Sequence, residues 1–475
     1  MHGQKTLMAV IMSFLSVLAL SVLIGKAVLG SGPAFKYTPV ALTGSVVRTQ
    51  PDAGLAGSSH GVALGDRLGI GGAPSPSHAE PWLNAAGGSP EKAVLAKPQS
   101  ASSLSLTPGQ TLPDAAGGIG VSQATVSEVA SQANWILSGQ FPDGALDEAP
   151  FPSWTSSVTI NPYVANYGAM GLARAAVVTG NMAYAQASWR WLDWYARHEQ
   201  PGTGFVANAT VPNPFIAGDH STSLGTMDST DAYAGTFLLA AYDTMTADPS
   251  QSELAGLASG ITGAVKAIEA TQQPNGLTWA KPSYQMAYLM DMAETHAGLL
   301  AAASLALILG NHALEATASR DASLMETGVQ SLWNPTTQSF DWAATSTAVQ
   351  LTNWNNLYPD AAEQAWAVGF GLATPSQAHL IMNEITAHAP QWDDPTATAK
   401  FKGSSAAQPV GYWPAIGWGF DAVGNMPAAQ QGATSIYAAA AVAQDGWPFT
   451  CEDSAQLIIL LSGGPTLAPT VPTTL

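Results

Sequence analysis

Three stretches of the sequence repeat a pattern of acidic residues that could take part in proton transfer. They read MDSTDAYAGTFLLAA (residues 227–241), MDMAETHAGLLAAA (290–303) and PDAAEQAWAVGFG (359–371). In every copy an aspartate is followed three positions later by a second acid and, four positions after that, by glycine or alanine. Positions i, i+3 and i+7 of a helix share one face. Each copy therefore predicts a helix with two acids at its start and a small residue two turns below.

These acids have both a structural and a catalytic interpretation. Aspartate is a common N-cap, and a capping box would explain a glutamate at the third helical position but explains Asp231 less well. Helix capping does not explain why the same pair of acids, three residues apart, recurs in all three copies. Clustered carboxyl groups repel one another, which raises the pKa of one member, and such pairs serve as general acid and base. We therefore predict that the catalytic residues are among Asp228, Asp231, Asp291, Glu294 and Asp360.

Aromatic and hydrogen-bonding residues gather around the same helix starts. Several tryptophans and tyrosines stand in loops just before an acid copy, where their rings could stack on the apolar faces of sugars. The segment INPYVANYG (160–168) would add neutral hydrogen-bonding groups, and FPDGALDE (141–148) a further carboxylate. The predicted substrate-binding residues are Asp143, Tyr163, Asn166, Tyr233, Trp279, Tyr284, His296, Tyr358, Glu363, Trp413 and Trp418.

The elements that must position these residues are helices. Ala- and Leu-rich segments recur, each bounded by Pro, Gly, Asn or Asp, and no stretch shows convincing strand alternation. We predict an all-α fold of about twelve helices, in which six hairpins close into a double ring, the (α/α)6 toroid. An open solenoid of hairpins is the alternative. The predicted ranges are 122–139, 162–179, 181–199, 228–246, 251–272, 285–310, 312–333, 359–372, 375–389, 412–424, 427–443 and 453–462.

The composition argues against several classes of partner and site. Residues 122–475 hold eight Lys and Arg against twenty-eight Asp and Glu, and this acidic surplus repels phosphate backbones. We expect no nucleic-acid partner. The single cysteine, Cys451, excludes an internal disulfide framework and a thiolate zinc site, and we predict that it is buried. We expect no metal and no cofactor.

The N-terminal part of the sequence has the pattern of an export signal. An apolar run from Leu7 to Gly25 lies between Lys5 and Lys26. As a helix this run would be about 28 Å long, enough to cross a bilayer. We predict a signal anchor over residues 1–26, with a cleaved signal peptide as the alternative. The protein would then be extracytoplasmic (periplasmic or secreted) and tethered to the inner membrane.

The rest of the chain divides into three parts by composition. Residues 27–121 are rich in Gly, Ser, Ala and Pro and are predicted to form a disordered linker. Residues 122–462 carry the helical pattern and are predicted to form the toroid. Residues 463–475 are predicted to be a disordered tail.

Five motifs in their order resemble the six-hairpin glycosidase superfamily: GQFPDGAL, INPYVANYG, MDSTDAYAGTFLLAA, LMDMAETHAGLL and YPDAAEQAW. The resemblance covers about residues 125 to 460. It implies the (α/α)6 toroid and, as in many members, an inverting glycoside hydrolase with acidic catalysts at the mouth of the ring. It assigns no particular hydrolase family, and so it does not say which acid donates the proton and which activates water.

The expected function is therefore hydrolysis of a neutral glycan outside the inner membrane, by an inverting pair of carboxyl groups. Three alternatives stay open. A polysaccharide lyase on the same toroid could use Tyr233 or His296 as a base, but the body has few cations to bind a uronate. A terpene-cyclase-like toroid fits poorly with an exported site. A non-catalytic glycan-binding toroid could serve polysaccharide assembly or export.

Overall fold

The computed structural model describes residues 122–150, 158–211, 218–446 and 448–468, and these residues are mostly helical. Each of the twelve predicted helices is present. The range predicted as 251–272 is divided at Leu257 into two helices, and the range predicted from 359 begins with a π-helical turn, η1 (Leu357–Ala361). The helices are α3 (Gln123–Ser138), α4 (Pro162–Thr179), α5 (Ala183–His198), α6 (Thr230–Ala247), α7 (Gln251–Gly256), α8 (Ala258–Glu269), α9 (Leu289–Ile308), α10 (His312–Gln330), α11 (Ala362–Gly369), α12 (Pro375–His388), α13 (Pro414–Ala422), α14 (Met426–Val442) and α15 (Cys451–Leu461).

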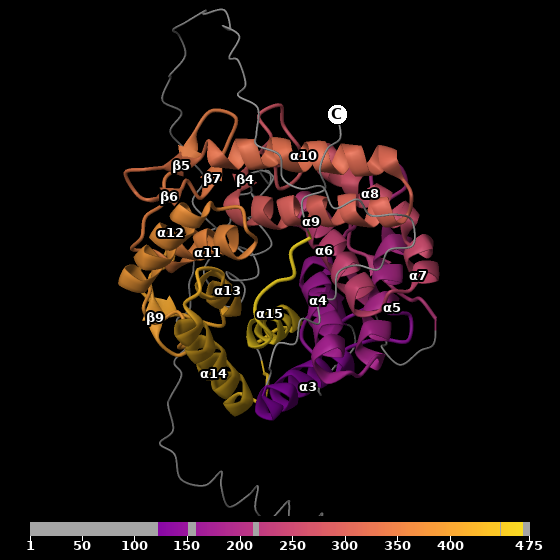
Figure 1. Cartoon of the computed structure of the whole chain (residues 1–475), viewed down its shortest axis with the longest axis horizontal. Helices are drawn as coiled ribbons and strands as arrows, with labels where there is room; N and C mark the ends of the chain where they lie inside the picture. The colour runs from indigo at the N-terminus through magenta and orange to yellow at the C-terminus, as the bar shows by residue number, and fades with distance from the viewer. Residues whose placement is uncertain (1–121, 151–157, 212–217, 447, 469–475) are drawn as a thin grey trace, which may run out of the picture. The chain divides into compact units, whose positions relative to one another are not determined.

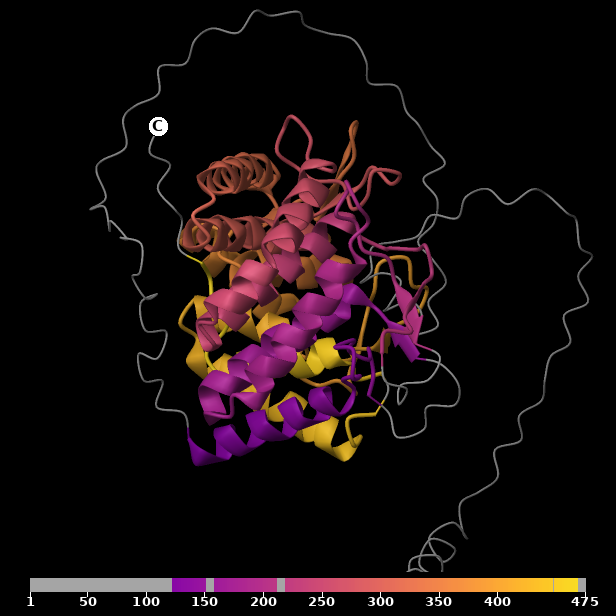
Figure 2. The same ribbon diagram turned by 90° about the vertical axis from the view of Figure 1, so that its right-hand side faces the viewer.

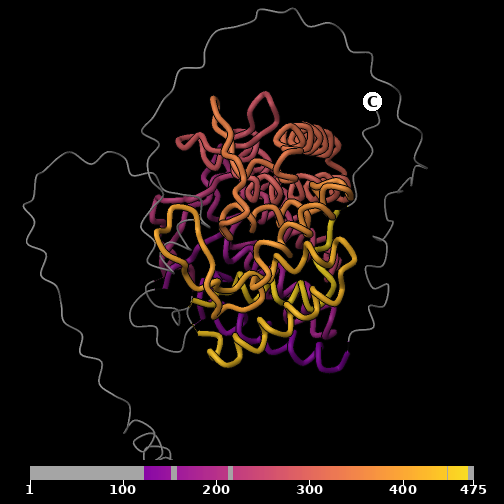
Figure 3. The backbone as a smooth tube through the Cα atoms, turned by 90° about the vertical axis from the view of Figure 1, so that its left-hand side faces the viewer, coloured from indigo at the N-terminus to yellow at the C-terminus, as the bar shows by residue number. Residues whose placement is uncertain are grey.

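Six of these helices form a closed inner ring. Helices α4, α6, α9, α11, α13 and α15 each contact the next, and α15 returns to contact α4. Helices α3, α5, α8, α10, α12 and α14 pack outside them, each against its neighbours in the ring (Figure 1). The first and last helices of the described chain, α3 and α15, contact each other (Figures 1 and 3). An open solenoid would keep its two ends apart, so the arrangement favours the predicted toroid.

The small residues two turns below the acids allow the inner helices to come close together. Gly235 and Gly298 face each other where α6 crosses α9: a methyl group added at Gly298 would lie 2.7 Å from Gly235 Cα. A methyl group at Gly235 would lie 2.7 Å from Thr295 Cα. The repeat therefore predicted correctly that the face carrying the acids is also the face on which neighbouring helices crowd.

The strands of the described chain are two or three residues long, too short to give the alternating pattern that a sequence reveals. They join the loops that lead into the inner helices: β1 ends two residues before α4, and β4 ends directly before α9. Figure 2 shows two strands of the first sheet as magenta arrows at one end of the helices. All pairs are antiparallel, in the sheets β1–β2–β3, β4–β7–β8, β5–β6 and β9–β10. The strands are β1 (Val158–Ile160), β2 (Ala209–Val211), β3 (Thr222–Ser223), β4 (Ala287–Tyr288), β5 (Trp333–Asn334), β6 (Ser339–Phe340), β7 (Ala343–Ala344), β8 (Val349–Gln350), β9 (Thr398–Ala399) and β10 (Gln408–Pro409).

The predicted signal anchor and the predicted linker lie outside the described residues. Within the described part of the chain, no helix has the length and hydrophobicity needed to span a membrane. Six residues of the predicted tail, 463–468, are described. The Gly464 carbonyl accepts a hydrogen bond from Arg174 Nη2 at 2.5 Å, and Ala468 is buried. Cys451 is buried, as predicted.

Candidate active site

The three acid copies meet at one end of the inner ring, because the N-terminal turns of the inner helices lie side by side. Ser229, the N-cap of α6, lies 2.9 Å from a carboxyl oxygen of Asp291 in the first turn of α9. The backbone N–H of Met290 in α9 donates to Glu363 Oε2 of α11 at 3.3 Å. Tyr163 OH at the start of α4 donates to Glu294 Oε1 of α9 at 2.6 Å. The repeats therefore point to the same end.

Two of the acids, Asp231 and Asp291, are joined through Ser229. Ser229 Oγ lies 2.6 Å from Asp231 Oδ1 and 2.9 Å from Asp291 Oδ2. Burial raises the pKa of Asp231 to about 6, although the hydrogen bonds from Ser229 and the Ala232 backbone oppose the shift. Burial raises the pKa of Asp291 well above its usual value, and repulsion from Asp231 and Glu294 raises it further.

Glu294 lies one turn further along α9 and is surrounded by donors. Its Oε1 accepts hydrogen bonds from Tyr163 OH and Tyr167 OH, both at 2.6 Å, and from Trp366 Nε1 at 3.0 Å. These donors come from α4 and α11, the first of which is not a neighbour of α9 in the ring. Glu294 therefore joins three inner helices across the middle of the ring.

The acids of the third copy are held at the start of α11. Asp360 Oδ1 accepts from the backbone N–H of Asn353 at 2.8 Å, and Oδ2 accepts from Asn356 Nδ2 at 3.2 Å. Burial raises the pKa of Asp360, and Asn353, Lys402 and Asn356 oppose this shift. Burial raises the pKa of Glu363 well above its usual value.

The acids lie inside the end of the ring and not on an open rim. Asp231, Asp291, Glu294 and Asp360 have no exposed surface, whereas Asp228 keeps 8%. The cause is the crowding of the helix starts, where tyrosine, tryptophan and serine side chains cover the carboxyl groups. Asp228 is thus the one predicted catalytic residue that retains exposed surface among those the structure describes, although its carboxyl oxygens are covered.

Two groups of aromatic rings adjoin these helix starts. Tyr358 stacks on Trp413 with ring centroids 5.4 Å apart. Tyr288, a residue that the sequence did not single out, stacks on Trp342 at 5.9 Å, and its hydroxyl lies 3.0 Å from that of Tyr284. Tyr288 is the N-cap of α9, three residues before Asp291, which places its ring close to the acids.

Several predicted substrate-binding residues instead serve the packing of the ring. Trp418 is fully buried, and its indole donates to the Gln456 carbonyl at 3.1 Å, so its position does not suit stacking on a sugar. Asn166 is also fully buried: it donates to the Tyr233 carbonyl at 2.9 Å and accepts from Trp191 Nε1 at 2.9 Å. Both residues lie on inner helices, but their side chains are buried in the core.

The remaining predictions fall in mixed surroundings. Tyr233 is buried and donates to Asn208 Oδ1 at 2.9 Å. His296 is 7% exposed, and burial lowers its pKa to about 4, so it is neutral near pH 7. Trp279 and Tyr284 are partly exposed in the loop between α8 and α9, where a sugar could reach them.

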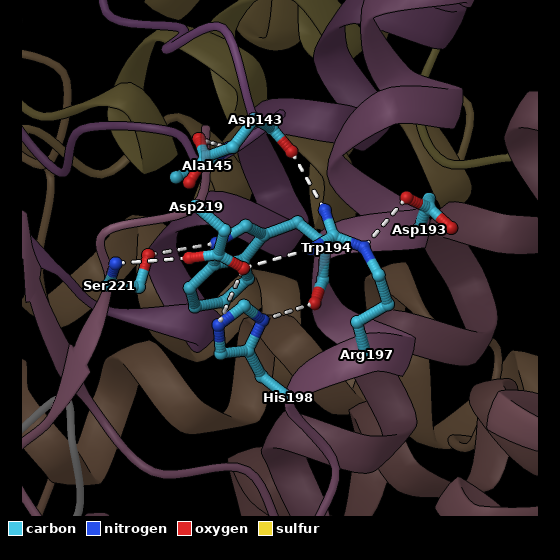
Figure 4. Close-up of polar contacts among 8 residues, drawn as sticks. All are labelled: Asp143, Ala145, Asp193, Trp194, Arg197, His198, Asp219 and Ser221. Carbon is cyan, nitrogen blue, oxygen red and sulfur yellow. Dashed lines mark hydrogen bonds and ion pairs between the residues drawn. The ribbon is translucent and has the colours of Figure 1, made fainter. Parts of the chain in front are cut away.

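Asp143 belongs to a separate network on the outside of the ring (Figure 4). Its Oδ1 accepts from the backbone N–H of Ala145, and its carbonyl accepts from Arg197 Nη2 at 2.9 Å. Arg197, near the end of the outer helix α5, also forms an ion pair with Asp219 at 2.9 Å. His198 Nε2 lies 3.3 Å from the same Asp219 oxygen. The network fastens two loops to α5, and Asp143 does not lie among the acid copies.

Two further carboxylates at this end were not predicted. Glu452 occupies the first turn of α15 and is partly exposed. Burial is the main cause of the raised pKa of Tyr163, Glu294 is the next, and Glu452 adds a smaller contribution. Glu148 is also partly exposed; burial and Asp228 raise the pKa of Tyr233, and Glu148 adds to this shift. The sequence after Glu452 lacks the second acid and the small residue of the repeat. Its position in the first turn of an inner helix could still have identified it as a candidate site residue.

The site resembles no metal centre. Among the described residues, no group of His, Cys, Asp and Glu has an arrangement that could hold a metal ion. No lysine or arginine pairs with Asp231, Asp291 or Glu363 in the part of the chain that the structure describes. Burial without a neighbouring cation raises the pKa of a carboxyl group, and a carboxyl group that keeps its proton near neutral pH can act as a general acid.

Known structures decide the fold. The sequence matches no protein-family model and no curated protein. A GH63 mannosylglycerate hydrolase from Thermus thermophilus, in complex with glucose, matches with a TM-score of 0.52 and 10% identity over 70% of this chain and 98% of that one. The chain has the fold of the six-hairpin glycosidases.

Two further structures agree. An uncharacterized conserved protein from Thermus thermophilus matches with a TM-score of 0.51 and 11% identity over 70% of this chain and 99% of that one. A glycosidase variant in complex with glucose matches with a TM-score of 0.50 and 15% identity over 71% of this chain and 96% of that one. The predicted superfamily fold is thereby confirmed, and each neighbour is covered over nearly its whole length.

Proposed function

We propose that this protein is an inverting glycoside hydrolase that acts on a neutral, glucose-containing glycan. The observation that carries the proposal is the gathering of acids from successive inner helices at one end of the ring, beside aromatic side chains. Two neighbours with this fold, a mannosylglycerate hydrolase and a glycosidase, hold glucose. Both facts support hydrolysis of a glycosidic bond, since that reaction needs one protonated and one ionised carboxyl group.

The carboxyl groups proposed to reach the substrate are those of Asp228 and Glu452. Glu452 is partly exposed, and Asp228 keeps 8% of its surface although its carboxyl oxygens are covered, whereas Asp231, Asp291 and Glu294 have no exposed surface. The rings of Tyr163 and Tyr233 are 6.2 Å apart. Besides burial, Glu452 raises the pKa of Tyr163 and Asp228 raises that of Tyr233, which supports the two acids being near this pair of rings. An inverting pair stands about 6.5–9.5 Å apart, with room for a water.

Asp231 and Asp291 are less suited to act as that pair. The Ser229 hydroxyl fills the space between them, so a sugar and a water could not enter there. We propose that these two acids, with Glu294 and Asp360, set the charge and position of the groups that face the substrate.

The test is the rate of hydrolysis on a panel of neutral glucans and glucosides. Asp228→Asn and Glu452→Gln should each lower kcat by about 10²–10⁴-fold, the usual contribution of a general acid or base. Asp193→Asn, which changes an exposed carboxylate on the outer helix α5, should leave kcat unchanged. Substrates with good leaving groups should rescue the variant of the general acid, and NMR of the first product should show the inverted anomer.

Other outcomes would identify the alternatives. Unsaturated product ends with a preference for uronate polymers would indicate a lyase, and binding without any product would indicate a non-catalytic toroid. Wild-type rates in both variants would exclude the proposed pair.

We also propose that the protein is exported and tethered through residues 7–25. The apolar run between Lys5 and Lys26 supports this location. Cell fractionation should recover the protein in the membrane fraction. A protease added outside the inner membrane should digest it. Recovery in the cytosolic fraction would contradict the proposal.

A further inference from the structure

The chain of contacts Asp231–Ser229–Asp291 fixes the position of a proton. Ser229 Oγ lies within hydrogen-bond distance of both carboxyl groups, at 2.6 Å from Asp231 Oδ1 and 2.9 Å from Asp291 Oδ2. A serine hydroxyl carries one proton and can donate one strong hydrogen bond. An ionised carboxylate has no proton to donate. If both aspartates were ionised, one of these two contacts would bring two acceptor oxygens together without a proton between them.

The other contacts show which aspartate is ionised. Asp231 Oδ1 also accepts the backbone N–H of Ala232 at 2.9 Å, so two donors point at it. Asp231 Oδ2 and Asp291 Oδ1 are both buried without a hydrogen-bond partner, so the two aspartates differ at their other oxygens. Among the described residues, the one hydrogen bond to Asp291 is the contact between its Oδ2 and Ser229. An ionised Asp291 would be a buried charge with no donor other than this shared hydroxyl, which is costly, whereas an ionised Asp231 accepts two donors. The pattern fits a protonated Asp291 that donates to Ser229, which in turn donates to Asp231.

We propose that Asp231 and Asp291 hold one proton between them at neutral pH, located on Asp291, and that Ser229 is the positioning residue that links them. This arrangement would keep one negative charge, not two, on the pair, which lies close to Asp228 in the sequence and to the start of α6. The existence of the shared proton does not depend on the proposed function. The effect on catalysis does.

The charges around the pair favour the same protonation state. Glu294 and Glu363 face Asp291 from its own helix and from α11, Tyr288 faces it from β4, and Asp228 lies one residue before Ser229. All are acidic groups. Lys281, whose Nζ donates to the Met227 carbonyl at 3.0 Å, is the nearest cation on the loop before α9. Burial and repulsion from these acids raise the pKa of Asp291, which agrees with the geometry.

Infrared spectroscopy of the whole protein tests the proposal without relying on activity. At pH 7 the wild-type protein should show the carbonyl stretch of a protonated, hydrogen-bonded carboxylic acid, and Asp291→Asn should remove this band. Asp243→Asn is the matched control: it changes another buried carboxyl group and should leave the Asp291 band in place. Absence of any protonated band in the wild type, or its loss in Asp231→Asn but not in Asp291→Asn, would overturn the proposal.

Two Ser229 variants separate the hydroxyl from the helix cap. Ser229→Gly removes the hydroxyl but keeps most of the capping, because glycine is a good N-cap, whereas Ser229→Thr keeps both. In Ser229→Gly the band should move to higher frequency, since the acid loses its acceptor, and in Ser229→Thr it should stay. If the proposed function holds, kcat should fall by about 10- to 100-fold in Ser229→Gly, the equivalent of one hydrogen bond to a charged group, and recover in Ser229→Thr. If the band does not move in Ser229→Gly, Ser229 does not link the two aspartates. If the band moves but kcat is unchanged, the shared proton stands and the proposed catalytic function is contradicted.

Discussion

Two acids on helix α9, one turn apart, have different surroundings. Glu294 receives three donors on one oxygen, whereas Asp291 meets a single serine and three neighbouring acids. Burial and repulsion from those acids raise the pKa of Asp291 well above its usual value. The surroundings of each acid are largely set by side chains from other helices, which sequence spacing alone does not reveal.

Removing one donor from Glu294 should be more destabilising than an equivalent change elsewhere. Tyr167→Phe keeps the buried ring but deletes the hydroxyl that donates to Glu294 at 2.6 Å. We expect a loss of about 1–3 kcal/mol in the free energy of unfolding, because a fully buried carboxyl oxygen loses one of its donors. Tyr184→Phe, which removes a hydrogen bond to the Asn134 amide at 2.8 Å, should lower the free energy of unfolding by about 0.5–1.5 kcal/mol. Equal losses in urea unfolding would contradict a larger contribution from the hydrogen bond to Glu294.

The buried Asp243 on α6 makes stability depend on pH. Burial raises its pKa from 3.8 to about 7, although Arg174 opposes the shift. In the pH range between these values the unfolded chain is ionised while the folded chain holds the proton. Stability is therefore greatest below pH 4 for this group and is lost as the pH rises towards 7. Asp243→Asn stays neutral at every pH, so its melting temperature should fall less than that of the wild type between pH 4 and pH 8. Parallel melting curves against pH would show that Asp243 ionises freely in the folded protein.

At the scale of elements, the crossing of α6 and α9 depends on a pair of glycines. Gly298→Ala would place a methyl group 2.7 Å from Gly235 Cα, and backbone cannot move aside as a side chain can. We expect the free energy of unfolding to fall by about 1–3 kcal/mol or more, the range for overpacking a core. The control is Gly256→Ala on α7, where a methyl group meets nothing within 4 Å and should stabilise the helix slightly. Both are measured by thermal melting, and an unchanged melting temperature for Gly298→Ala would mean that the two helices can separate freely.

The helices and the repeated acids could be predicted because they leave periodic signals. The acids of the three copies lie at one end of the ring, and glycine or alanine lies two turns below them, as the spacing indicated. The covering of the acids could not be predicted. Tyr167 and Trp366 reach Glu294 from other helices, distant in the sequence, and Trp342 stacks on Tyr288 from the short link between β6 and β7. Such contacts follow from ring closure and have no local pattern.

At the scale of the whole molecule, the described helical body should fold without the N-terminal segment. Helix α3 begins at Gln123 with its own cap, Ser122, whose side chain accepts the Thr125 N–H, and it packs against α4 and α15. A variant lacking residues 1–121 should therefore remain helical by circular dichroism and melt in one cooperative transition. Loss of the transition would show that residues before 122 contribute to the core.

The contact of α15 with α3 and α4 couples closure of the ring to protonation. Closure of the ring buries acids that stand in water in the unfolded chain. In water they would be ionised at neutral pH. Folding at neutral pH must then be accompanied by uptake of protons from the solvent.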